Sequence, residues 1–195
     1  MNFLFDLPEG FDLVSDFLTL EEWLFVIVIP MAIVFGVTFY IGLERQNVGK
    51  AAGISAHVLV GLGALMISLV QRIMYYDQIN AGLDPEGQRV IAQVVSGIGF
   101  IGAGVIMKDN KNIIHGITTA ATLWFSALLG IVCGSGHLWE GAFFGLFVVI
   151  FITIRDLKRG LNPLRSNKNS IGARLNPNKK ITVQVSEEEK WNLTQ

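Results

Sequence analysis

The sequence predicts an all-α, polytopic membrane protein with five transmembrane helices, and three observations lead to this fold class. Hydrophobic residues make up 51% of the 195 residues and charged residues only 16%, which is too apolar for an ordinary soluble domain. Uncharged runs of about twenty residues recur along the chain, each long enough to cross a hydrocarbon core of ~30 Å. Lysine and arginine gather in alternate connections between these runs, the asymmetry that orients membrane proteins.

The first two uncharged runs cover residues 23–43 and 51–71. Pro30 lies inside the first run and should kink the helix, because proline removes a backbone hydrogen bond and clashes with the preceding turn. A short charged loop, 44–50, connects the two runs, and a polar turn at 77–88 follows the second. Each run is therefore predicted to form one transmembrane helix.

The third run, from Arg89 to Lys108, holds eighteen uncharged residues between its two bases and is predicted to be the central helix of the bundle. Small residues recur along it at helical spacing, and in lipid such residues let helices approach closely. We therefore expect this helix to pack against its neighbours and to join copies of the chain into a homo-oligomer. The residues expected at these helix contacts are Gly97, Gly99, Gly102, Ala103 and Gly104.

Residues 117–133 and 137–154 are predicted to form the fourth and fifth helices, separated by the turn Gly134-Ser135-Gly136. Five spans place the two termini on opposite sides of the membrane. The segments on one side hold thirteen of the 15 lysines and arginines, so we expect the N-terminus outside and the C-terminus in the cytoplasm. The expected domains are an acidic extracytoplasmic segment at 1–20, the five-helix membrane domain at 21–155, and a basic cytoplasmic tail at 156–195 that could begin a soluble domain.

Several polar residues near the expected cytoplasmic side are candidates for function. Glu44 and Arg45 could form a buried pair that holds a loop or coordinates a cation, or they could belong to a solvated loop together with Lys50. His57 lies inside the second run, where an ionisable side chain is costly unless it faces protein or water. It could relay protons or serve as a neutral packing residue, and both interpretations stay open.

Four further polar residues are candidates on the later helices. Gln93 and Ser96 on the third helix, and Thr118 and Thr119 at the start of the fourth, could satisfy one another by hydrogen bonds across helices. Free N–H groups at a helix start also favour an anion, which would give the two threonines a binding role. Thr119 as a plain N-cap is the more economical interpretation.

The candidate metal ligands are Glu44 and Asp109, although neighbouring bases oppose them. Mg²⁺ prefers oxygen ligands and keeps most of its waters, so an outer-sphere complex is conceivable. No P-loop, HExxH or GxSxG motif is present, and the GxGxxG match at 97–102 lies inside an apolar run instead of following a strand. We therefore expect no enzyme activity, no resident cofactor and no nucleic-acid partner, with the lipid bilayer as the surroundings.

Three blocks of sequence occur in a specific order over residues 36–155. The first combines GLERQ at 42–46 with GKAAG at 49–53 and His57, the second is AQVVSGIGFIGAG at 92–104, and the third is GITTAATLW at 116–124. Together they resemble the signatures of the MgtC/SapB family of bacterial inner-membrane proteins. Ser55-Ala56 and His115 stand where the family usually has arginine-threonine and arginine, so a grip on an anion or a lipid phosphate is in doubt. The lack of these two bases makes a cation site near Glu44 more plausible.

The resemblance implies a multi-pass protein of the bacterial inner membrane that supports growth or survival at low magnesium and, in some members, virulence. It implies transport of Mg²⁺ or another ion, with Mg²⁺ as substrate or signal. The alternative is a regulator that transports nothing and instead binds a membrane partner such as the F-type ATP synthase.

Overall fold

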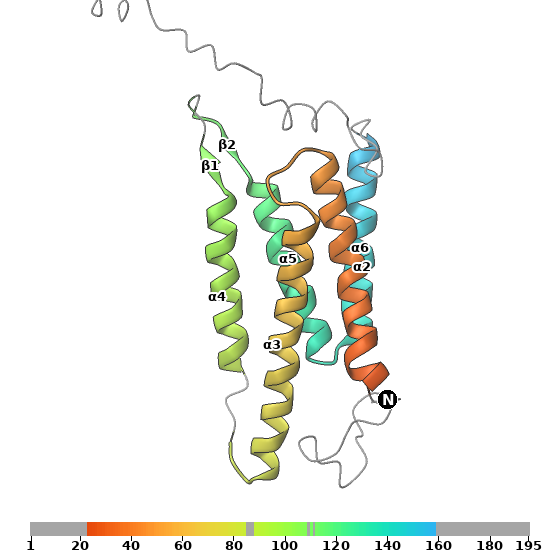
Figure 1. Ribbon diagram of the computed structural model, residues 1–195, viewed down its shortest axis with the longest axis vertical. Coiled ribbons are helices and arrows are strands. Elements are labelled where there is room, and N and C mark those ends of the chain that lie inside the picture. Colours follow the sequence, from red (N-terminus) through yellow and green to blue (C-terminus); the bar gives the residue numbers. More distant parts are fainter. Residues whose placement is uncertain (1–22, 85–87, 109, 111, 159–195) are drawn as a thin grey trace, which may run out of the picture.

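The computed structural model describes residues 23–84, 88–108, 110 and 112–158. Within these residues, five long helices lie side by side and run alternately up and down the bundle (Figure 1). Four of them are long and apolar enough to cross a membrane, and a shorter apolar helix at Arg89–Val105 accompanies them. The predicted all-α membrane fold is confirmed. The predicted segment at 1–20 and nearly all of the tail at 156–195 lie outside the described residues.

The helices are connected in simple sequence order. The helix α2 covers Ile29–Asn47 and is preceded by one π-helical turn, η1, at Leu24–Val28. It is followed by α3 at Ile54–Asn80, α4 at Gln88–Val105, α5 at Ile117–Gly134 and α6 at Leu138–Lys158. A short antiparallel hairpin joins α4 to α5, with β1 at Met107–Lys108 paired to β2 at Ile114–His115.

The distortion predicted at Pro30 lies in the helical turn before it. Proline has no N–H to donate, and its ring displaces the carbonyl four residues earlier. The N–H of Ile29 instead bonds to the carbonyl of Leu24, five residues back, which widens the turn to a π-helical one. The helix therefore continues through Pro30 without ending.

α3 extends to Asn80, well beyond the end predicted for it at residue 71. Arg72 ends the uncharged run, but a charged residue at the membrane surface does not end a helix. The chain turns only at Gly82, whose φ of +74° is a conformation that glycine adopts readily. The uncharged run thus predicts the apolar part of this helix and underestimates its length.

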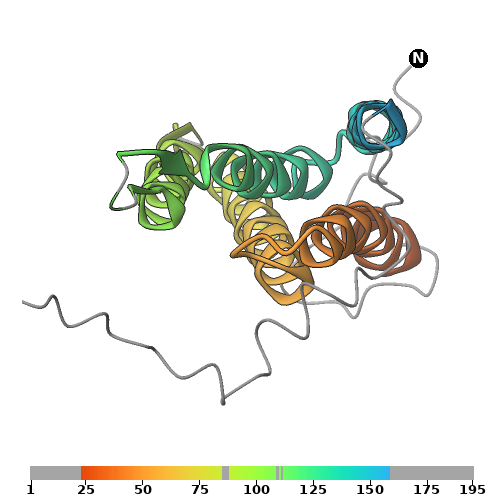
Figure 2. The same cartoon turned by 90° about the horizontal axis from the view of Figure 1, so that it is seen from above.

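The helix α5 is the centre of the bundle, because it contacts α2, α3, α4 and α6. Figure 2 looks along the helices and shows α4 at the edge of the bundle, beside α5. The prediction that residues 89–108 form the central helix is therefore wrong. α4 turns its bulky side inward, where Ile91, Val94, Val95 and Ile98 pack against buried residues of α3 and α5. Bulky side chains make more van der Waals contacts with protein than small ones do, so the bulky face of α4 is the one that packs inside the bundle.

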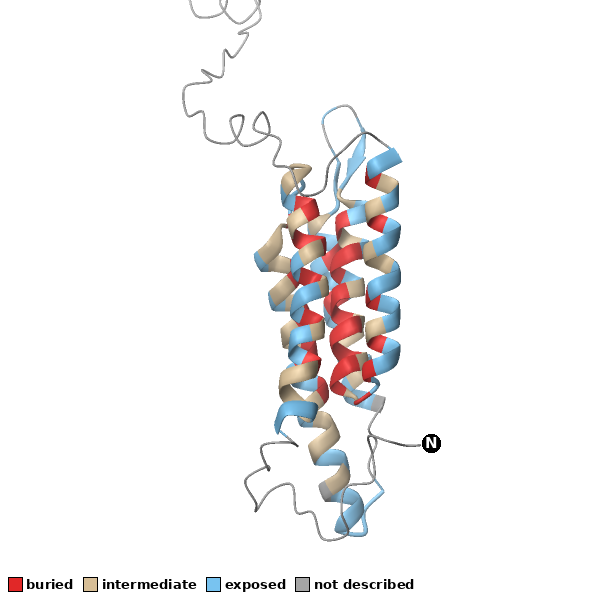
Figure 3. Ribbon diagram, turned by 90° about the vertical axis from the view of Figure 1, so that its right-hand side faces the viewer, coloured by how far each residue is buried: buried red, intermediate tan, exposed pale blue. Residues whose placement is uncertain are grey.

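The most extensive helix contact joins α3 to α5. A methyl group on Gly130 would overlap the carbonyl oxygen of Gly61, and one on Gly134 would lie 2.7 Å from the carbonyl oxygen of Leu65. Small residues at this spacing let two helix backbones meet in lipid. Buried residues accordingly run along the middle of the bundle in Figure 3. We call this contact the α3–α5 seam, formed by Gly61 and Ser68 on α3 and by Ser126, Gly130 and Gly134 on α5.

The start of α5 differs from the predicted N-cap. α5 begins at Ile117, after Gly116, whose φ is +93°. A side chain at Gly116 would overlap the carbonyl oxygen of Val105, so the turn from the hairpin into α5 requires glycine. Thr119 is consequently buried in the first turn of α5 and is not its N-cap, whereas Thr118 is exposed.

Candidate functional site

Four charged side chains meet where α2 and α6 end, at the upper end of the bundle in Figure 1. Glu44 and Arg45 lie in the last turn of α2, and Arg155 and Asp156 in the last turn of α6. Glu44 and Asp156 are each 1% exposed and Arg45 is 3% exposed. The Glu44–Arg45 pair is therefore buried and does not belong to a solvated loop. We call these four residues the charge network.

Two arginines hold the carboxylates of this network. Arg45 donates from Nε and Nη2 to the two carboxylate oxygens of Glu44. Arg155 donates from Nη2 to Glu44 Oε1 at 3.0 Å and from Nε to Asp156 Oδ1 at 2.8 Å. One guanidinium thus links the end of α2 to the end of α6.

The charge network has two positive and two negative groups, so it is neutral when every group is ionised. Burying charged groups is costly unless they are paired and hydrogen-bonded, and removing one partner leaves an uncompensated charge. A hydrogen bond between Tyr40 and Thr153 joins the same two helices one turn deeper. The network and this bond together fix how α2 and α6 approach each other.

The network does not fit a Mg²⁺ site. Both carboxylate oxygens of Glu44 already accept hydrogen bonds from arginine. Nowhere in the described part of the chain do three histidine, cysteine, aspartate or glutamate side chains come together as metal ligands would. Asp109, the other candidate ligand, lies outside the described residues. We therefore do not carry Glu44 forward as a metal ligand.

His57 lies in the first turn of α3 and is fully buried. Its Nδ1 is 2.8 Å from the carbonyl oxygen of Gly53, and its Nε2 is 3.0 Å from Oγ1 of Thr122 on α5. A carbonyl oxygen can only accept, so Nδ1 must carry a hydrogen. Thr122 Oγ1 also lies 3.0 Å from the carbonyl oxygen of Thr119. Both ring nitrogens thus lie within hydrogen-bonding distance of protein atoms. Thr122 has a single hydroxyl hydrogen, which can satisfy either a neutral Nε2 or the carbonyl oxygen of Thr119, so both interpretations of His57 stay open.

The remaining candidates lie away from these groups. Lys50 is exposed in the loop after α2, and Thr118 is exposed at the start of α5. A methyl group on Gly102 would lie 3.7 Å from the side chain of Ala120, and Gly102 is the buried member of the predicted packing set. The other candidates on α4 lie on its exposed side, namely Gln93, Ser96, Gly97, Gly99, Ala103 and Gly104.

The sequence reasoning missed Asp156 as a partner of Glu44 and the glycines of the α3–α5 seam. A signal for the first existed. α2 and α6 each end their apolar run in an adjacent acid–base pair, Glu44-Arg45 and Arg155-Asp156, at the same expected membrane surface. A signal for the second was the four-residue spacing of Ser126, Gly130 and Gly134.

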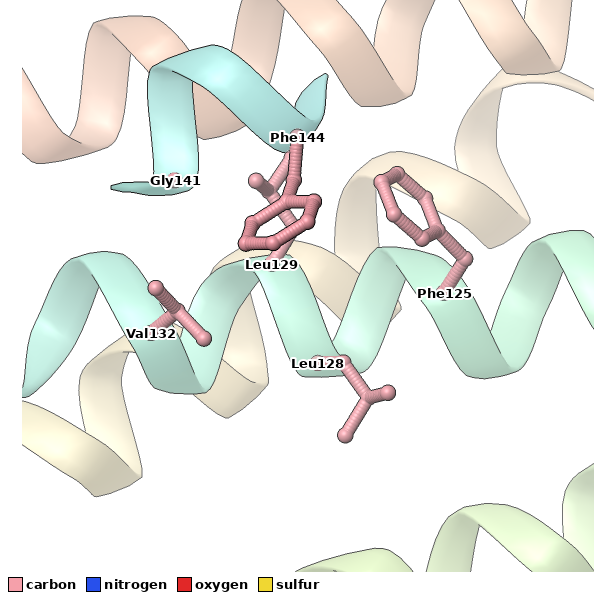
Figure 4. A pocket seen from close by; sticks show the side chains of 6 residues that line it. All are labelled: Phe125, Leu128, Leu129, Val132, Gly141 and Phe144. Carbon is pink, nitrogen blue, oxygen red and sulfur yellow. The ribbon is translucent and has the colours of Figure 1, made fainter. Parts of the chain in front are cut away.

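A hollow of about 210 Å³ lies between α5 and α6 and has only apolar walls. Phe125 and Phe144 cover it from the two helices, with Leu128 and Val132 beside them (Figure 4). It offers no oxygen or nitrogen side chain to an ion, and it is not part of the candidate site.

Comparison with known proteins gives the following matches. The MgtC family matches residues 30–159. An Escherichia coli K12 protein named "Putative magnesium transporter YhiD" is 44% identical over 115 residues, which are 57% of this chain and 52% of that protein. "Protein MgtC" of Brucella abortus is 40% identical over 109 residues, 56% of this chain and 42% of the relative. The chain thus spans about half the length of these relatives. No solved structure shows significant similarity to it.

Proposed function

The chain belongs to the MgtC family, and on that basis we propose that it is a protein of magnesium homeostasis that acts as a regulator of a membrane partner and does not conduct the ion itself. The relative named as a magnesium transporter links this group of proteins to magnesium. The single observation that favours regulation is the closed interior of the bundle.

The interior closes in the middle of the described helices. The charge network lies at one end, and His57, Thr122 and Ser126 follow within the next turns of the bundle. Below them the α3–α5 seam brings Gly130 against Gly61, with no room even for a methyl group. A core cluster that includes Val34, Leu65, Leu129 and Cys133 fills the neighbouring space. A hydrated ion needs a path wide enough for its oxygen ligands or waters, and the contact between Gly130 and Gly61 leaves no such width between α3 and α5.

The proposed location is the bacterial inner membrane, with the charge network at the cytoplasmic side. The ends of α2 and α6, the loop between α2 and α3, and the β1–β2 hairpin lie at the upper end of the bundle in Figure 1. These segments hold five bases, namely Arg45, Lys50, Lys108, Arg155 and Lys158. The other two described bases are Arg72, in the second half of α3, and Arg89, at the start of α4. The positive-inside rule then orients the upper end toward the cytoplasm.

The regulator would bind its partner through exposed helix faces in the membrane. α4 lies at the edge of the bundle and exposes Gln93 and Ser96 on its outer side. Polar side chains and glycines on a lipid-exposed face favour contact with another helix. Either a second copy of this chain or a partner such as the F-type ATP synthase would supply that helix.

Transport by an oligomer is the second candidate. The exposed amide of Gln93 and hydroxyl of Ser96 would line a path between copies, where the interior of a single chain has none. This candidate agrees with the name of the Escherichia coli relative, which calls that protein a magnesium transporter.

Magnesium flux into proteoliposomes separates the two candidates. We expect correctly inserted full-length protein to give the same Mg²⁺-indicator signal as empty vesicles, with an added ionophore as the positive control. Flux that Gln93→Leu abolishes and that Lys50→Gln leaves unchanged would contradict the regulator and support a path along α4.

A further inference from the structure

The hydrogen bonds of the charge network are shared unequally between its two carboxylates. Glu44 accepts three of the four bonds from the arginines, and Asp156 accepts one, at Oδ1. Asp156 Oδ2 is buried and has no hydrogen-bond partner among the residues that the structure describes. A buried polar atom without a partner has lost its hydrogen bonds to water without replacing them, which is unfavourable, so this oxygen needs a hydrogen-bond donor.

The two carboxyl groups are direct neighbours. The same edge of the Arg155 guanidinium binds one oxygen of Glu44 and one oxygen of Asp156. Two carboxylates held this close repel each other unless a proton lies between them, as in other paired carboxyl sites.

We propose that Glu44 and Asp156 together form a binding site for one proton. The proton, taken from water, makes one carboxyl group a donor, and its O–H bonds to the carboxylate of the other residue. Asp156 Oδ2 then has a partner, and the net charge of the network changes from zero to plus one. The two carboxyls titrate as a unit, so the proton belongs to the pair.

The charged surroundings of the pair are arginine-rich. α2 contributes Arg45 and α6 contributes Arg155, whereas His57 of α3 makes its hydrogen bonds with Gly53 and Thr122. α5 carries no charged residue at any position. Lys50 and Lys158 are exposed beyond the network. Because two guanidiniums already face the pair, a proton fits there better than a divalent cation, which would need further oxygen ligands.

Infrared difference spectroscopy of the full-length protein in lipid bilayers tests this proposal. A protonated carboxyl group absorbs separately from a carboxylate, so the spectrum reports the proton directly. We expect wild-type protein at neutral pH to show a protonated-carboxyl band that is lost in Asp156→Asn and in Glu44→Gln. Glu140→Gln is the matched control, because Glu140 is an exposed carboxylate on the same helix α6, and it should keep the band.

Two results would overturn the proposal. A band that persists in Asp156→Asn, or that forms only at the pH at which exposed carboxylates protonate, would show that the pair holds no proton near neutrality. A wild-type band that millimolar Mg²⁺ removes would assign the pair to a metal cation instead. If either variant fails to fold, the pH dependence of the wild-type band decides, since the band must persist at a pH at which exposed carboxylates have lost their protons. ¹³C labels on aspartate carboxyls in one sample and on glutamate carboxyls in another then show which residue type carries the proton. The test uses no partner and measures no flux, so its outcome is independent of the proposed function.

Discussion

Two helices of the bundle carry small residues at helical spacing, and they use them differently. On α5, Gly130 and Gly134 are buried against the backbone of α3. On α4, Gly97 and Gly99 are exposed, and nothing described lies within 4 Å of the side chain that either position lacks. The same kind of pattern thus forms an internal seam in one helix and an outer surface in the other.

The difference lies in what the rest of each helix offers. α4 has a bulky face, with Ile91 and Ile98, that gains more from packing inside the bundle than its small face does. α5 is surrounded by helices, so its small face has a neighbour whichever way it turns. Small residues at helical spacing therefore show that another helix can approach this backbone closely. The opposite face of the helix determines whether that neighbour belongs to the same bundle or to another chain.

The largest expected loss of stability comes from placing a bulky side chain in the α3–α5 seam. Gly130→Leu should destabilise the bundle by about 3 kcal/mol or more, because its first carbon already overlaps the Gly61 carbonyl oxygen and neither backbone can move alone. Gly99→Leu, the matched change on α4, should alter the free energy of unfolding by less than about 0.5 kcal/mol. Chemical unfolding in detergent measures both. Equal losses of stability in the two variants would remove the distinction between the helices.

A smaller loss of stability should follow when the serine in the α3–α5 seam is replaced by alanine, and none when the serine on the exposed side of α4 is replaced. Ser68 donates to the carbonyl oxygen of Ile131 at 2.9 Å and lies 2.9 Å from Ser135 Oγ. Ser68→Ala should therefore cost about 1 kcal/mol, near the upper part of the range for hydrogen bonds between membrane helices. Ser96→Ala, on the exposed side of α4, should leave the stability of the monomer unchanged within error. A measurable loss in Ser96→Ala and none in Ser68→Ala would reverse the assignment of the two faces.

The smallest effect on stability should come from Ser96→Cys, because this side chain lies on the exposed side of α4, and cross-linking of this variant reports directly whether copies associate. In a Cys133→Ala background, which removes the single native cysteine, Ser96→Cys should form disulfide-linked dimers in membranes if copies meet through α4. Ser68→Cys, buried in the seam, should form none. Electrophoresis without reductant reads the result. Cross-linking of Ser68→Cys alone would show that the seam opens, and no cross-linking of either would argue against a dimer through α4.

The sequence predicts the positions of the helices well and their arrangement poorly. The predicted fourth helix at 117–133 agrees with α5 at Ile117–Gly134, because the thickness of the bilayer and a glycine turn define its length. The central position of α5 was not predictable in the same way, since an edge helix and a central helix both need an apolar sequence. Helix spacing alone also says nothing about which faces meet.

The candidate site was predictable in part. Glu44, Arg45 and His57 stand out because charged and ionisable groups inside a membrane protein are costly. Their partners come from distant parts of the chain, and Arg155 is 111 residues from Glu44. Local sequence patterns do not show which distant residues pair. The adjacent acid–base pairs Glu44-Arg45 and Arg155-Asp156, expected at the same membrane surface, did indicate that α2 and α6 could be joined there.

The unequal lengths of the helices have a consequence for the lipids around the protein. α3 has 27 residues, which at ~1.5 Å each amounts to ~40 Å, against ~30 Å for the hydrocarbon core. α3 is locked to α5 along the seam and cannot tilt by itself, so its last turns extend past the ends of its neighbours (Figure 1). Met74 and Ile79 are exposed there. Tyr75 and Tyr76, residues of a type that is typical of a membrane interface, contact each other edge to face just after Arg72. Because Arg72 ends the uncharged run, the protein should place the last turns of α3 among the lipid headgroups and beyond them, so the extra length of this helix requires no thickening of the hydrocarbon core.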